Sequence, residues 1–109
     1  MLGNENNYGL FWSGAETEDF PEEESKKKAV GEKYGRPMYK LMNLAAKKIK
    51  ELDSNHPVAI CNGDDLFIDI VAEECRDIDI FGVNSYRGAS FTNLFKTVKE
   101  TLNKPLLFT

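Results

Sequence analysis

Short apolar runs alternate with amphipathic segments along this chain, and that alternation limits the folds it can adopt. Four runs have the character of parallel strands: residues 2–5, 58–62, 78–86 and 106–109. The last three are β-branched or aromatic runs too continuous for a sheet with one face in water. Alternation of this kind predicts right-handed βαβ units around a parallel sheet. We therefore expect an α/β fold, either a doubly wound sheet or a piece of a barrel.

Helical periodicity appears between these runs. The helices are expected over residues 38–52, 65–75 and 92–102. Pro37 is suited to the first turn of the first helix, and Asp64 or Asp65 to the N-cap of the second. Apolar residues at three- and four-residue steps predict one buried stripe on the first helix. That stripe comprises Met38, Leu41, Met42, Ala45, Ile49 and Leu52.

Residues 6–33 differ from the rest of the chain. They are rich in Gly, Glu, Lys and Asn, and they contain Trp12 and Phe20 without helical spacing. An irregular stretch of this length inside a compact domain usually has a function. Because it follows the first strand, we expect it at the carboxyl end of the sheet, where parallel α/β folds build their sites.

Composition excludes some classes of partner. The formal net charge of -4 argues against a nucleic-acid surface, which gathers Lys and Arg on one face. No apolar run approaches the roughly 20 residues that cross a bilayer, so no membrane segment is expected. The two cysteines, Cys61 and Cys75, have no metal-ligand spacing and are expected to be reduced and structural.

Residues 1–109 are expected to form one partial domain, truncated at both ends, because both termini fall within strands. Such a slice would leave two sheet edges unpaired, and unpaired edges favour self-association. It would also leave a concave interior open to water, which we expect to be lined by Val58, Ile60 and Ile80.

A carboxylate preceded by an amide, Asn4-Glu5, stands at the end of the first strand. Alone, such a pair is explained by capping or a salt bridge. Residues 2–5, however, resemble the acid/base motif that ends barrel strand four in clan A glycoside hydrolases. Residues 79–86 resemble the sixth strand of that clan, and residues 104–109 resemble the run leading into its nucleophile. The likeness is strongest to the barrel domain of glycoside hydrolase family 2, through Asn4-Glu5-Asn6-Asn7-Tyr8-Gly9-Leu10-Phe11-Trp12.

This resemblance implies an incomplete (β/α)8 TIM barrel, with strands four to seven, that acts on a carbohydrate substrate without a cofactor or metal. A retaining glycosidase holds two carboxyl groups about 5 to 5.5 Å apart, one as nucleophile and one as acid/base. The resemblance assigns the acid/base role to Glu5 and places the nucleophile, a Glu, directly after Thr109. It also implies that Tyr86 orients that nucleophile and that Asn4 binds the sugar 2-hydroxyl. Asn4 and Glu5 can both reach a sugar only if the strand end is kinked or bulged.

Four more residues are candidates for substrate contacts. Alternation on residues 78–86 places Asn84 with Tyr86 at the barrel interior. Asn62 is suited equally to a substrate contact or to a turn, and Arg87 to a hydroxylated or anionic sugar or to the surface. Trp12 offers a large aromatic face that either stacks on a sugar or packs within its loop.

Several alternatives remain open at this point. Family 5 glycanases and fungal β-1,3-glucanosyltransferases share the same skeleton, so hydrolysis and transglycosylation are not distinguished. A catalytically silent α/β binding or assembly module would show the same alternation of elements. Neither the sugar, nor the linkage, nor the compartment follows from the sequence.

Overall fold

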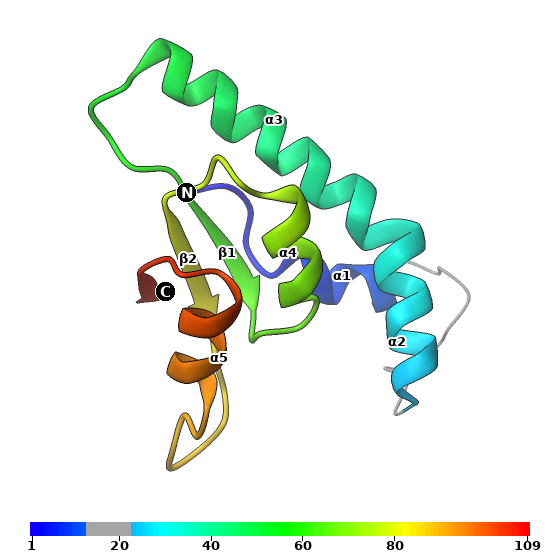
Figure 1. The fold of residues 1–109 in the computed structure, drawn as a ribbon. Helices are drawn as coiled ribbons and strands as arrows, with labels where there is room; N and C mark the ends of the chain where they lie inside the picture. The colour runs from blue at the N-terminus through cyan, green and yellow to red at the C-terminus, as the bar shows by residue number, and fades with distance from the viewer. Residues whose placement is uncertain (13–22) are drawn as a thin grey trace.

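The computed structural model describes residues 1–12 and 23–109 and shows a mixed α/β fold built on a three-stranded parallel sheet (Figure 1). The strands are β1 (Ala59–Gly63), β2 (Ile80–Asn84) and β3 (Leu106–Phe108), in the spatial order β1-β2-β3. A parallel bridge between Leu2 and Ile60 places the N-terminal segment along the other edge of β1. The predicted α/β class with parallel strands is confirmed.

Three helices bury one face of this sheet: α3 (Arg36–Leu52), α4 (Ile68–Glu74) and α5 (Leu94–Thr101). Figure 1 shows α5 in front of β2, and α4 to the right of β1. Branched and aromatic strand residues, which fit a pleated surface, meet helix side chains in one core. The cluster includes Val58, Ile60, Phe81 and Val83 from the strand segments and Tyr39, Ala46, Val71, Leu94 and Val98 from the helices.

The register of the sheet decides which side chains face the helices. Ile60 pairs with Phe81 and Asn62 with Val83, and paired residues of a parallel sheet point to the same face. On β2 the predicted alternation is confirmed. On β1 the face assigned to Val58 and Ile60 is wrong, because these residues are 3% and 1% exposed within the helix-covered core instead of lining an open interior.

Small side chains occupy the opposite face. Ala59 and Cys61 lie there on β1, and Gly82 lies opposite Cys61 on β2. A Cβ atom at Gly82 would stand 2.3 Å from the carbonyl oxygen of Ile60, so the two strands approach too closely there for any side chain. This second face is therefore shallow, and its chemistry comes from polar side chains at its carboxyl end.

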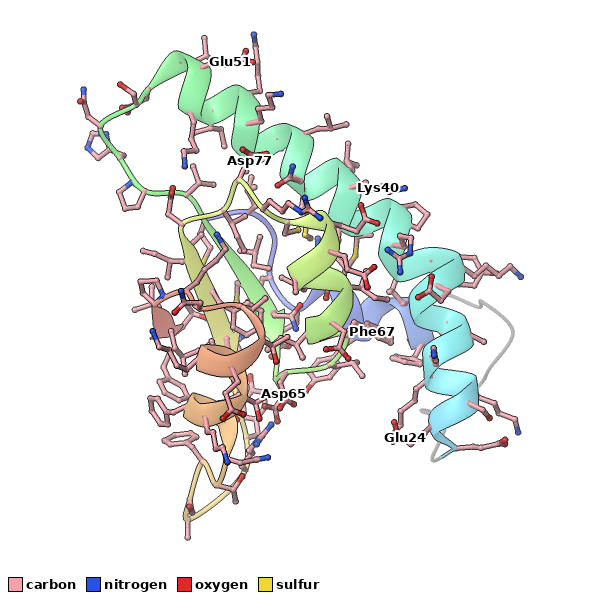
Figure 2. The ribbon with its side chains drawn as sticks, viewed as in Figure 1. Glu24, Lys40, Glu51, Asp65, Phe67 and Asp77 are labelled. Carbon is pink, nitrogen blue, oxygen red and sulfur yellow. The ribbon has the colours of Figure 1, made fainter. Side chains whose placement is uncertain are left out.

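Asp79 fastens the beginnings of β1 and β2 to α3. Its carboxylate accepts a hydrogen bond from Val58 N at 2.8 Å and from Lys50 Nζ at 2.6 Å. The hydrogen bond from Lys50 and the one from the Val58 amide hold the pKa of Asp79 below its usual value. Nearby, the carboxylate of Asp77, labelled in Figure 2, accepts a hydrogen bond from Asn43 of α3 at 2.8 Å.

The helix that was expected to begin at Pro37 begins earlier. An α-helical segment, α2 (Glu24–Val30), leads through a π-helical turn, η1 (Gly31–Gly35), directly into α3. The residues before Pro37 lack an apolar stripe, and instead charged pairs such as Lys27 with Glu24 and Arg36 with Glu32 support the helix. Pro37 lies in the first turn of α3, where the helix changes type, so its missing N–H does not end it.

The apolar stripe predicted for α3 is also shifted. The helix buries Tyr39 and Ala46, with Met38 and Met42 packed against the core. Four apolar residues of α3 lie exposed instead: Leu41, Leu44, Ile49 and Leu52. The carboxyl half of α3, which carries Ile49 and Leu52, extends past the sheet in Figure 1.

The segment 6–33, expected to be irregular, contains helices. A short helix, α1 (Asn6–Trp12), starts immediately after Glu5, and α2 begins at Glu24. Phe20 lies outside the described residues. The other predicted helices are shorter than expected, because Phe67 adopts a left-handed conformation, with φ 63°, directly before α4, and Thr92 does so, with φ 47°, before α5.

The outer edge of β3 carries an aromatic cluster. Phe91, Phe95 and Phe108 lie with ring centroids 4.3 to 6.3 Å apart and are 38%, 55% and 39% exposed. Leu94 and Val98 are the buried residues of α5, so Phe91 and Phe95 lie outside the core. Within residues 1–12 and 23–109, no helix is both long and apolar enough to span a membrane.

Candidate functional site

The N-terminal segment leaves the sheet through a one-residue bulge. Leu2 O accepts a hydrogen bond from Cys61 N at 3.4 Å, as in a regular parallel ladder. A regular ladder would next join Asn4 N to Cys61 O, but Glu5 N takes that place at 3.0 Å. Gly3 and Glu5 adopt positive φ angles of 69° and 50° to accommodate the extra residue. The kink that Asn4 and Glu5 need if both are to reach one ligand is thus present.

Four polar side chains meet beside this bulge. Asn4 Oδ1 accepts hydrogen bonds from Asn84 Nδ2 at 3.0 Å and from Cys61 Sγ at 3.2 Å. Asn84 Oδ1 in turn accepts one from Thr109 Oγ1 at 2.6 Å. Cys61 Sγ lies 3.0 Å from Thr109 Oγ1 and closes the group. This amide cluster joins the N-terminal segment, β1, β2 and the residue after β3.

Glu5 stands at the edge of the amide cluster, half-buried. The Tyr86 hydroxyl donates a hydrogen bond to the Glu5 carboxylate, and this bond raises the pKa of Tyr86 above its ordinary value. The other carboxylate oxygen, Oε1, is buried and has no hydrogen-bond partner among the described residues. Buried acceptors without a partner are costly, and they are a common feature of functional sites.

Tyr8 adds a second phenol to the site. Its ring lies against Gly63, where a Cβ atom would stand 2.3 Å from the ring, so β1 must end in glycine here. Burial raises the pKa of Tyr8, and the nearby carboxylates Asp64 and Glu5 raise it further. Asn7 holds α1 in this position, because its buried amide exchanges hydrogen bonds with Gly63 O at 2.8 Å and Gly63 N at 2.7 Å.

Two predicted contact residues are engaged elsewhere. Asn62 is 3% exposed on the helix-covered face, where it accepts a hydrogen bond from Tyr39 Oη at 2.6 Å and donates to Asp64 O at 2.9 Å. The turn-forming alternative therefore applies to Asn62. Arg87 pairs with Asp64 at 2.8 Å and Asp65 at 2.7 Å at the rim of the sheet, which raises the pKa of Arg87. The loop that carries Asp65 is labelled in Figure 2.

The structure thus brings Asn4, Glu5, Asn84 and Tyr86 together and leaves Asn62 outside. Trp12 is the last residue of α1, and its side chain lies outside the described structure. Sequence reasoning missed Tyr8 and the roles of Cys61 and Thr109. Tyr8 stood within the stretch that most resembles family 2, and strand alternation applied to β1 in the correct register would have placed Cys61 on the site face.

A wide depression of about 750 Å³ lies elsewhere, between α2, η1 and α4. It is apart from the amide cluster, and ion pairs of Arg36 with Glu32 at 2.8 Å and Glu73 at 2.6 Å occupy its charged side. Phe67, labelled in Figure 2, is one of the residues that line it. Over residues 1–12 and 23–109, no group of three or more His, Cys, Asp or Glu side chains is arranged to hold a metal ion.

Comparisons with known proteins find no match for this chain. No protein-family model, no curated protein and no solved structure matches it. A functional assignment therefore depends on the geometry of the site together with the sequence resemblance.

Proposed function

We propose that this chain is part of the catalytic barrel of a retaining β-glycoside hydrolase similar to family 2, with Glu5 as general acid/base. The substrate is a β-linked carbohydrate. The three parallel strands and the bridged segment at Leu2 correspond to strands four to seven of an incomplete (β/α)8 barrel. Helices on one face and small or polar residues on the other are the arrangement expected of a barrel wall.

The bulge between Leu2 and Glu5 is the observation that carries this proposal. Catalysis requires the amide of Asn4 and the carboxylate of Glu5 to address one sugar, which a regular strand forbids. The replacement of Asn4 N by Glu5 N in the ladder removes that obstacle. Both side chains then lie at the carboxyl end of a parallel sheet, where barrel enzymes place their catalytic groups.

Each residue has a definite task in this reaction. Glu5 gives a proton to the leaving oxygen and later takes one from water. The nucleophile, placed by the resemblance directly after Thr109, would adjoin the amide cluster, because Thr109 shares Asn84 with Asn4. Tyr86 would then lie between the two carboxylates.

The test uses the complete gene product and aryl β-glycosides of graded leaving-group acidity. In Glu5→Gln, hydrolysis of substrates with poor leaving groups should fall about 10²- to 10⁴-fold, the usual contribution of general acid catalysis. A dinitrophenyl leaving group needs no proton, so kcat/KM for its release should be nearly unchanged, although turnover slows because no base takes the proton from water in the second step. Glu51→Gln, on the exposed end of α3, is the matched control (Figure 2). An equal loss on both substrates, or no glycosidase activity at all, would refute the proposal.

The second candidate is an α/β assembly module without catalysis. The exposed aromatic cluster at the edge of β3 favours it, because contiguous apolar surface of this kind marks interaction sites. The two candidates differ in what Glu5→Gln does. The substitution abolishes proton donation in the enzyme, whereas it leaves association through Phe91, Phe95 and Phe108 intact.

A further inference from the structure

We propose that Cys61, Asn84 and Thr109 are positioning residues that fix the orientation of the Asn4 amide, so that its nitrogen faces the substrate. This inference rests on the proposed function, and it changes the expected role of Asn84 from substrate contact to support. It follows from the direction of the hydrogen bonds in the amide cluster.

The chain of bonds starts at Thr109. Its hydroxyl donates to Asn84 Oδ1, which commits Asn84 Nδ2 to face Asn4. Asn84 Nδ2 donates to Asn4 Oδ1 at 3.0 Å. The Cys61 thiol lies beside both amide oxygens, 3.2 Å from Asn4 Oδ1 and 3.4 Å from Asn84 Oδ1, and its single proton can be donated to either one. An amide has its oxygen and nitrogen on opposite branches, so fixing one fixes the other.

Asn4 Nδ2 is the donor left over at the end of this series of hydrogen bonds. Among residues 1–12 and 23–109 it donates to no protein atom, and the Asn4 side chain is exposed at the carboxyl end of the sheet. A ligand at this place must therefore offer an acceptor, such as a hydroxyl oxygen beside the reacting carbon. Under the proposed function that acceptor is the sugar 2-hydroxyl, so the preference for 2-hydroxyl sugars over 2-deoxy sugars reports the orientation of the Asn4 amide.

The substitution Asn84→Asp should reverse the hydrogen bond between residue 84 and Asn4. A carboxylate accepts but does not donate, so it would draw Asn4 Nδ2 toward itself and away from the substrate. In the 109-residue chain, labelled with ¹⁵N, the side-chain amide signal of Asn4 should move and its exchange with water should slow. Asn103→Asp, an exposed change of the same type, should leave the Asn4 signal in place. An unaltered Asn4 signal in Asn84→Asp would overturn the inference, whatever the protein's activity.

Kinetics of the complete gene product supply the second readout. The preference in kcat/KM for a β-glycoside over its 2-deoxy analogue should fall roughly tenfold in Asn84→Asp, the worth of one hydrogen bond. Thr109→Val should reduce that preference and Thr109→Ser should restore it. An equal loss on both substrates would indicate a merely structural role and overturn the inference. If Glu5→Gln shows no glycosidase signature, the proposed function fails, while the Asn4 signal still decides whether the cluster orients Asn4.

Discussion

Replacement of Tyr39 by phenylalanine tests how β1 is attached to the helices. Tyr39 is fully buried, and its hydroxyl donates to Asn62 Oδ1 at 2.6 Å. Burial raises the pKa of Tyr39, so the hydroxyl stays protonated and remains a donor throughout the ordinary pH range. Because phenylalanine keeps the ring, Tyr39→Phe removes one hydrogen bond and little packing.

The size of the expected destabilisation follows from the hydrogen bond that Asn62 Oδ1 loses. Asn62 Nδ2 keeps its bonds to Asp64 O and Leu66 O, but no other described residue donates to Oδ1. A buried acceptor left without a donor costs about 1–3 kcal/mol. For a chain of this size that corresponds to a fall in Tm of roughly 5–15 °C.

Urea unfolding followed by circular dichroism measures this change. Tyr39→Phe should lower the midpoint at unchanged m value, which reports lost stability without a change in exposed surface. Tyr34→Phe, at a half-buried position in η1 of the same continuous helix, should shift the free energy of unfolding by no more than about 0.5 kcal/mol. If the two variants unfold at the same urea concentration, then Asn62 does not depend on Tyr39 and the register argument for β1 fails.

Three further predictions concern the sheet. Gly82→Ala should destabilise the fold by about 3 kcal/mol or more in urea titrations, because a backbone oxygen blocks the new methyl group. Gly9→Ala is the control and should be neutral or stabilising, because there is open space around Gly9. Asp79 has a folded pKa below its unfolded value, so its contribution to stability is full above about pH 4 and disappears as pH falls through the folded pKa. Asp79→Asn should flatten that acid limb, and an unchanged pH profile of unfolding would contradict the assignment. Phe95→Lys should weaken concentration-dependent self-association in sedimentation experiments, and a parent chain that stays monomeric at all concentrations would contradict the role of the β3 edge.

The sequence was sufficient where one physical signal dominated. The continuous apolar runs around Ile60, Val83 and Leu106 predicted parallel strands, and each strand lies within one or two residues of the expected place. The kink at Glu5 was expected as well, because strand alternation and the resemblance together require it if Asn4 and Glu5 are to reach one sugar.

The failures have distinct physical causes. The start of the long helix was missed because ion pairs, not an apolar stripe, support residues 24–35. The inward face of β1 was inverted because the register between Ile60 and Phe81 is a tertiary property that no single strand encodes. For the same reason the sequence left Asn62 between a substrate contact and a turn. The register of β1 and the hydrogen bond from Tyr39 determine which face of the sheet Asn62 occupies.

Chemical rescue of a Glu5 variant tests the central claim most directly. In Glu5→Ala of the complete gene product, azide can enter the space vacated by the carboxylate and attack the glycosyl intermediate without base assistance. Azide should accelerate turnover of dinitrophenyl β-glycosides and yield a β-glycosyl azide, identified by ¹H NMR. Turnover that ignores azide, or an azide product of inverted configuration, would contradict the assignment of Glu5 as acid/base of a retaining enzyme.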